Sequence, residues 1–239
     1  MRAAPLLALV LLAGCGGQPA AERPPPEQHF AVATERPRPA QPQGRWPTAR
    51  VLRRTALRAA PGWRAVGRLR PRTEFGSPKV VSVLRRRGGW LRVVVPERAN
   101  GRPAWIRAAA TRPGAVDVSL HVDRSARRLT VRRGSRVLRR VAIAVGRPGT
   151  ETPRGRFAVT DKLRGADFGD YYGCCILAIS GRQTNLPPRW RGGNLLAIHG
   201  GPTWAIGGEL SAGCLHAGET DLRWLMRRIP LGTPITIHP

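Results

Sequence analysis

The stretch from residue 195 to residue 215 reads LLAIHGGPTWAIGGELSAGCL. Its apolar start, residues 195–198, predicts a buried strand that ends at His199. Cys214 follows fifteen residues after that histidine, directly behind the glycine-bearing run 211–213. Thiol catalysis needs an imidazole that takes the proton of a cysteine, because the thiolate is the nucleophile. The pattern therefore predicts a cysteine nucleophile at position 214 with a histidine base at position 199, provided that the fold brings the two together.

The same pair also fits a purely structural role. A histidine at the end of a strand can be a core residue, and a cysteine can be a small buried apolar side chain. Gly213 favours the catalytic interpretation, because a residue without a side chain lets a substrate carbonyl approach the main chain. Backbone N–H groups of such a turn can hold the developing oxyanion. Taken alone, a histidine and a cysteine fifteen residues apart are weak evidence, and the structural interpretation is then the better one.

Short β-rich runs surround this stretch from about residue 115 onward. Residues 116–122 alternate apolar and polar side chains, as a half-buried strand does. Further strands are expected at 129–131, 137–145, 157–159 and 233–237. A single helix is expected at 221–228, because acidic residues lie near its start, arginines lie near its end and Pro230 stops it. This half of the chain is therefore predicted to be mainly β with one clear helix.

Several motifs follow one another in order through the same half of the chain. They are VGRP at 145–148, TPRG at 152–155, HG at 199–200, SAGCL at 211–215 with Asp221 seven residues past the cysteine, and PLGTPITI at 230–237. In this order they resemble the catalytic domain of the L,D-transpeptidases of the YkuD type, over about residues 116–238. The resemblance implies a β-sandwich-like fold with a covered cleft, and it implies neither a metal nor another cofactor.

For the reaction, the resemblance implies that Cys214 attacks the carbonyl carbon of the third residue of a peptidoglycan stem peptide. The terminal D-alanine leaves, a thioester remains, and an amine of a neighbouring stem resolves it to a 3→3 cross-link. His199 is the implied general base, oriented through its other nitrogen by the backbone carbonyl of Gly200. The implied substrate-binding residues are Ser211, Gly213 and His216.

Two positions depart from the family pattern. The family commonly has histidine between the serine and the glycine that precede the cysteine, where this chain has Ala212. We therefore expect no second histidine to assist His199. The family also commonly has arginine or asparagine two residues after the cysteine, where this chain has His216. A histidine there predicts weaker substrate contact, with a pH dependence near neutrality.

The first 45 residues predict export to the cell envelope. Residues 1–14 combine an early arginine with an apolar run too short to cross a bilayer, which is typical of a signal peptide. The ending LAGC resembles the bacterial lipobox, so Cys15 is the expected lipidation site and would anchor the protein to a membrane. An ordinary cleavable signal with an incidental cysteine is the alternative. Residues 15–45 are rich in proline and poor in apolar side chains, which predicts an extended linker.

Residues 46–112 form another β-rich region, with turn signals between short runs. About five strands within about sixty residues predict a small barrel. The motifs TALRAAP at 55–61, GGWLRV at 88–93 and NGRPAWI at 100–106 resemble a bacterial SH3-like domain. Domains of that family often bind the cell wall or orient on it, but such a barrel can also be only a spacer. The chain is thus predicted to carry two domains, 46–112 and 115–239, behind the linker.

The remaining cysteines suggest no site of their own. Cys174 and Cys175 are adjacent in sequence, and adjacent cysteines seldom pair because the small ring strains the backbone, so we expect two buried apolar side chains. With Cys15 lipidated, three cysteines remain, an odd number that indicates a reactive thiol in an exported chain. A zinc site that adds Cys214 and the nearby histidines is the weaker option, since the spacing matches no known ligand pattern.

The formal net charge of +27 favours an anionic partner, such as an acidic wall polymer. The arginines are scattered through strand-like segments and aromatic residues make up only 5% of the chain, whereas single-stranded nucleic acid needs aromatic platforms in basic surroundings. Nucleic acid is therefore not an expected partner. A GC-rich coding bias, which the abundance of arginine, alanine, glycine and proline suggests, explains the charge better and requires no partner.

Three other functions compete with transpeptidation. Water as the acceptor would make the enzyme an L,D-carboxypeptidase, and the sequence does not separate the two. A papain-like peptidoglycan peptidase would place the cysteine before the histidine, and here the order is reversed. A non-catalytic wall-binding lipoprotein would keep the basic surface, but it would not need the intact pair of Cys214 and His199.

Overall fold

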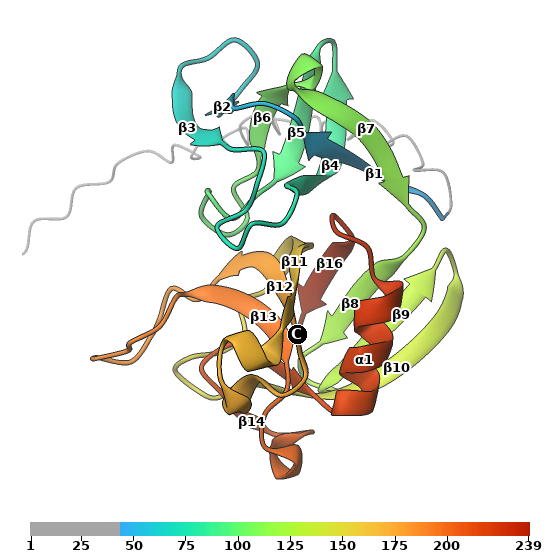
Figure 1. The fold of residues 1–239 in the computed structure, drawn as a ribbon, viewed down its shortest axis with the longest axis vertical. Helices are drawn as coiled ribbons and strands as arrows, with labels where there is room; N and C mark the ends of the chain where they lie inside the picture. Colours follow the sequence, from blue (N-terminus) through green and yellow to red (C-terminus); the bar gives the residue numbers. More distant parts are fainter. Residues whose placement is uncertain (1–43) are drawn as a thin grey trace, which may run out of the picture. The chain divides into compact units, whose positions relative to one another are not determined.

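The computed structural model describes residues 44–239. The predicted signal peptide (1–14), the lipidation site Cys15 and almost all of the predicted linker (15–45) lie outside these residues. Two β-sheets and one α-helix make up the described part (Figure 1). No helix within it is long and apolar enough to cross a bilayer. The prediction of a mainly β protein with one clear helix is confirmed for this part of the chain.

The first sheet has seven strands in the order β3-β2-β6-β5-β4-β1-β7. They are β1 (Trp46–Val51), β2 (Thr55–Arg58), β3 (Ala65–Leu69), β4 (Val80–Arg87), β5 (Trp90–Val94), β6 (Ala104–Arg107) and β7 (Thr111–Val116). Side chains alternate across each strand, so Leu91 and Val93 are buried while Arg92 between them is exposed. This alternation lets an arginine-rich segment supply a sheet with an apolar core.

The second sheet has nine strands in the order β14-β10-β15-β13-β12-β11-β16-β8-β9. They are β8 (Ser119–Asp123), β9 (Arg128–Arg133), β10 (Arg136–Gly146), β11 (Gly155–Arg164), β12 (Cys175–Arg182), β13 (Leu195–His199), β14 (Glu209–Ser211), β15 (Leu215–Ala217) and β16 (Pro234–His238). β9 also pairs with β10, near the other end of this order. The sheet therefore curls until it closes around one apolar core, whose members include Leu120, Leu177 and Ile198.

The helix α1 (Glu219–Arg228) begins two residues before the predicted start and ends at the predicted residue. Leu222 and Leu225, three residues apart and so on one face, are fully buried against the core of the second sheet. Glu219 and Asp221 lie in its first turn, and Arg227 and Arg228 lie in its last. The acidic residues thus lie at the N-terminal end of the helix and the arginines at its C-terminal end, which is the arrangement that the helix dipole favours.

Candidate active site

Two neighbouring parallel strands position the predicted catalytic residues. β13 pairs with β15 so that Ile198 lies beside Leu215 and His199 beside His216. Ile198 and Leu215 belong to the core, and side chains alternate along a strand. His199 and His216 therefore lie on the opposite face of the sheet. Cys214 directly precedes β15, and the same alternation places it on the side of the two histidines.

His199 is buried and held in one tautomer. Its Nδ1 atom lies 2.6 Å from the carbonyl oxygen of Gly200. A carbonyl oxygen only accepts hydrogen bonds, so Nδ1 carries the ring proton and Nε2 keeps a free lone pair. Burial first, and the neighbouring His216 second, lower the pKa of His199 to about 3, although the bond to Gly200 acts in the other direction. The imidazole is therefore neutral at pH 7.

Cys214 is the free cysteine of the described residues, and it is half-buried. Burial raises the pKa of its thiol to about 11, although a hydrogen bond with the backbone of Ala197 lowers it. The thiol is therefore protonated at pH 7 while His199 is neutral. The resting site holds a neutral thiol and a neutral imidazole, not a preformed ion pair.

A second histidine, His216, lies beside His199. Its ring centroid lies 4.6 Å from that of His199. The prediction that no second histidine assists His199 rested on Ala212 alone, whereas the register of β13 and β15 brings in a histidine from another position. The side chain is buried, and burial lowers its pKa below the usual value, which moves its titration away from neutrality.

A loop that the sequence did not single out covers the two histidines. We call residues 165–174, between β11 and β12, the tyrosine loop. The ring of Tyr172 lies 4.8 Å from that of His199, and the ring of Tyr171 lies 5.7 Å from that of His216. Burial, followed by the nearby Cys214, raises the pKa of Tyr171. The chain has only two tyrosines, and they are adjacent in the sequence of this loop. This pair is the sequence feature that could have pointed to the loop.

The tyrosine loop is attached closely to the strand end that carries His199. The N–H of Gly200 donates a hydrogen bond of 2.9 Å to the carbonyl oxygen of Tyr172. Gly173 has φ +64°, and a Cβ atom added there would lie 3.1 Å from the Cα atom of Gly200. Two glycine backbones therefore meet here without side chains between them. This close approach holds the tyrosines against the histidines.

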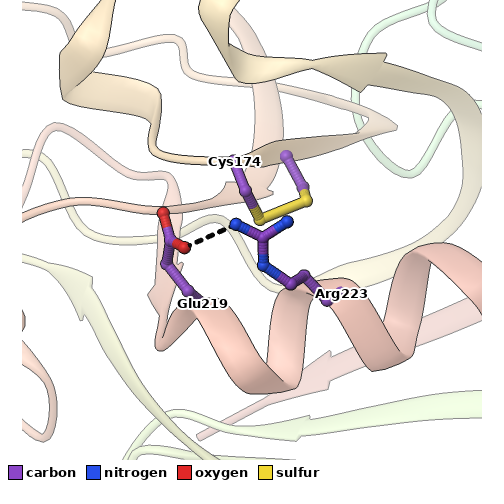
Figure 2. The surroundings of a disulfide bond; sticks show 4 residues. Cys174, Glu219 and Arg223 are labelled. Atoms are coloured by element: carbon purple, nitrogen blue, oxygen red, sulfur yellow. Dashed lines mark hydrogen bonds and ion pairs between the residues drawn. A yellow bond between two sulfur atoms is a disulfide. The ribbon is translucent and has the colours of Figure 1, made fainter.

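The loop ends in a disulfide that joins Cys174 to Cys175, which corrects the prediction of two unpaired side chains. Ring strain makes such pairing uncommon. Gly173, which directly precedes the pair, has a positive φ that glycine adopts readily. Figure 2 shows the disulfide beside the ion pair of Glu219 and Arg223, whose atoms Oε2 and Nη2 lie 2.9 Å apart at the start of α1. With their sulfur atoms bonded to each other, these cysteines do not form the zinc site considered above.

Ser211 and Gly213 shape the turn that carries Cys214. Ser211 is buried, and its Oγ atom donates to the carbonyl oxygen of Cys214 at 2.6 Å and accepts from the N–H of Gly213 at 3.0 Å. Gly213 has φ +114°, a conformation that side-chain-bearing residues rarely adopt. The structure thus places Ser211 inside the turn, where it fixes the position of the cysteine.

Comparison with known proteins identifies the second half of the chain. The family model described as the L,D-transpeptidase catalytic domain, YkuD, matches residues 117–237. The chain is similar to YkuD of Bacillus subtilis, with 30% identity over 129 residues that make up 53% of this chain and 69% of that protein. It is also similar to YkuD of Bacillus licheniformis, with 28% identity over 131 residues, and the covered shares are 53% of this chain and 69% of that protein.

Solved structures give weaker similarities. An L,D-transpeptidase from Mycobacterium smegmatis is 17% identical with a TM-score of 0.40, over 63% of this chain and 90% of that one. L,D-transpeptidase 3 from Mycobacterium tuberculosis, in complex with a faropenem-derived adduct, is 17% identical with a TM-score of 0.39, over 57% of this chain and 73% of that one. The family model and the two Bacillus relatives are the basis of the assignment: this chain belongs to the YkuD family of L,D-transpeptidases.

Proposed function

We propose that this protein is an exported peptidoglycan L,D-transpeptidase in which Cys214 is the nucleophile and His199 the general base. The observation that carries the proposal is the 2.6 Å contact between His199 Nδ1 and the Gly200 carbonyl oxygen, on a strand adjacent to the cysteine. It leaves Nε2 as a free base on the face of the sheet that holds Cys214. A protein that only bound the wall would have no need of this arrangement.

The reaction begins from the neutral pair. As the Cys214 sulfur forms a bond to the carbonyl carbon of the third stem residue, its proton passes to His199 Nε2. Backbone N–H groups of the turn hold the oxyanion, and Gly213 leaves room for the substrate next to them. When the intermediate collapses, the bond to the terminal D-alanine breaks and its amine takes the proton from His199. A thioester on Cys214 remains.

The second half of the cycle transfers the acyl group. The amine of a neighbouring stem attacks the thioester carbon and gives its proton to His199. The carbon–sulfur bond breaks, the sulfur takes the proton back, and the product is a 3→3 cross-link. No cofactor takes part in these steps. His216 and Tyr171 lie on the same face as the pair, and we place them at the wall of the substrate cleft.

Purified protein mixed with tetrapeptide-stem muropeptides tests this function by mass spectrometry of the products. Dimers that have lost D-alanine support the transpeptidase. Tripeptide monomers without dimers support the alternative, an L,D-carboxypeptidase with water as the acceptor. Cys214→Ala is the control, and equal product from this variant, or no product from the unmodified protein, would contradict an enzymatic function.

Three further proposals concern features other than the catalytic residues. We propose that the seven-stranded sheet is an SH3-like module that binds the wall or serves as a spacer, and that acidic wall polymers attract the chain through its charge of +27. We also propose that Cys15 is lipidated and anchors the protein to a membrane. Cys15→Ala should release the protein from the membrane fraction, and continued attachment of this variant would exclude the lipid anchor.

A further inference from the structure

The turn that presents Cys214 has every one of its four carbonyl oxygens bound. The carbonyl of Ser211 accepts from Arg147 N at 3.0 Å and from Thr150 Oγ1 at 3.1 Å. The carbonyl of Ala212 accepts from Gln183 Nε2 at 3.1 Å, and that of Gly213 accepts from Thr152 Oγ1 at 2.9 Å. The carbonyl of Cys214 accepts from Ser211 Oγ at 2.6 Å. A turn fixed at each peptide has little freedom to rotate its N–H groups. The side chains of Thr150, Thr152 and Gln183 therefore hold the turn from outside.

Thr152 holds the peptide that joins Gly213 to Cys214. Its hydroxyl accepts a hydrogen bond from Gly146 N at 2.9 Å, so its single proton is free to go to the Gly213 carbonyl oxygen. The side chain is fully buried. In a trans peptide the C=O and N–H groups point in opposite directions. By binding the Gly213 carbonyl, Thr152 directs the N–H of Cys214 away from itself.

Gln183 holds the preceding peptide. Its Nε2 atom faces three carbonyl oxygens, those of Thr150 at 3.0 Å, Glu151 at 3.1 Å and Ala212 at 3.1 Å. Its Oε1 atom accepts from Asn185 N at 3.0 Å, so the orientation of the amide is fixed by its partners. The residue is buried and ties the nucleophile turn to the loop that carries Thr152.

Gly213 fits between these two supports. A Cβ atom added to it would lie 2.4 Å from Gln183 Nε2, which is far inside contact distance. The N–H of Gly213 already donates to Ser211 Oγ. The N–H of Cys214 is therefore the one whose direction is set by a side chain outside the turn, because Thr152 binds the carbonyl oxygen of the same peptide. An oxyanion donor contributes most when it is already oriented before the charge develops.

We propose that Thr152 and Gln183 are positioning residues of the acyl-transfer reaction, which hold the Cys214 N–H in the direction of the developing oxyanion. This inference rests on the proposed function, because it needs Cys214 to be the nucleophile. Neither side chain touches the substrate. Thr152 acts through the Gly213 carbonyl, and Gln183 acts through the Ala212 carbonyl.

The test compares two reactions of Cys214 that differ in whether an oxyanion forms. Release of D-alanine from tetrapeptide-stem muropeptides passes through an oxyanion, whereas alkylation by iodoacetamide at pH 9 does not. Thr152→Val should lower kcat for D-alanine release about tenfold or more while KM changes less than about twofold. Its alkylation rate should stay within about twofold of the unmodified protein, because the thiol is still in place. Gln183→Met should show the same pattern.

Two further variants separate positioning from folding. Thr152→Ser keeps the hydroxyl and should restore kcat to within about threefold of the unmodified protein. Thr233→Val is the matched control, since Thr233 is equally buried and its hydroxyl donates to the Pro230 carbonyl at 2.7 Å, outside the turn. This control should leave kcat unchanged.

The outcomes distinguish the proposed function from the positioning role. An unmodified protein that releases no D-alanine, or a Cys214→Ala variant that still does, overturns the proposed function. An active protein whose Thr152→Val and Gln183→Met variants keep their kcat overturns the positioning role alone. A loss of alkylation in parallel with kcat, or an equal loss in Thr233→Val, also overturns it, because the effect would then be general loss of structure.

Discussion

The imidazole rings of His199 and His216 lie 4.6 Å apart, centroid to centroid, at paired positions of the parallel strands β13 and β15. Both side chains are buried, and the presence of His216 contributes to the low pKa of His199. In this chain the second histidine of the site therefore comes from the strand that follows the cysteine. Two buried imidazoles in contact disfavour a positive charge on either of them.

His216→Phe should move the acid limb of the pH–rate profile to higher pH. A general base must be neutral, so activity rises as pH rises through the pKa of His199, and loss of the His216 charge raises that pKa. The limb should stay below the usual histidine range, because burial, the larger cause, remains. The measurement is kcat/KM against pH, with His121→Phe on β8 as the matched control. An acid limb that does not move would show that the two rings do not interact electrostatically.

The Cys214 thiol should react slowly at neutral pH in the absence of substrate. Its pKa of about 11 means that the thiolate fraction, and with it the rate of alkylation by iodoacetamide, keeps rising up to about pH 11. The measurement is that rate against pH in the native protein, with the denatured protein as the reference for an unperturbed thiol. A plateau already reached below pH 7 would show a preformed thiolate–imidazolium pair and would contradict the neutral resting site.

Gly173→Ala should both destabilise the protein and lower kcat. The backbone at Gly173, with φ 64° and ψ −148°, lies in a region that is nearly restricted to glycine, and substitution there costs about 1–3 kcal/mol. The added methyl group would also push on Gly200 and displace the tyrosine loop from His199. Thermal unfolding and kcat are the two measurements.

Gly149→Ala is the control for Gly173→Ala. Gly149 also has a positive φ, of 86°, but no atom lies within 4 Å of a Cβ atom added to it. It should therefore share the backbone strain and keep its kcat. If both variants lose activity equally, the close approach of the tyrosine loop to Gly200 has no functional importance.

The cysteines should differ in their labelling by iodoacetamide under denaturing conditions. Without a reductant, Cys214 should be labelled while Cys174 and Cys175 stay unlabelled, because their sulfur atoms are bonded to each other. After reduction all three should be labelled. Peptide mass spectrometry reads both states, and labelling of Cys174 or Cys175 without reductant would show that the disulfide is absent.

Much of the fold was predictable, because it depends on local patterns. Alternation over 116–122 and the charge distribution over 221–228 predicted β8 and α1 to within about three residues, since burial of alternate or helically spaced side chains selects those elements. The order of the HG and SAGCL motifs gave the family, which the family model over residues 117–237 confirms. These features are each contained in a short stretch of sequence.

The surroundings of the site were less predictable, because they depend on contacts between distant segments. His216 meets His199 only through the register of two parallel strands, which no local pattern specifies. The tyrosine loop has no periodic pattern, and its place over His199 is set by the contact between Gly173 and Gly200. Likewise, Thr152 belongs to a motif that the sequence reveals, but its hydrogen bond to Gly213 becomes visible only in three dimensions.

The bond between Cys174 and Cys175 has a practical consequence for anyone who prepares this protein. Thiols are kept reduced in most cytoplasms and become oxidised outside them. Material produced in the reducing cytoplasm of an expression host would therefore differ by two hydrogen atoms from material produced in an oxidising compartment, at the end of the loop that covers His199. Rates measured on the two preparations would describe different covalent molecules, so the oxidation state of this pair should be established before their activities are compared.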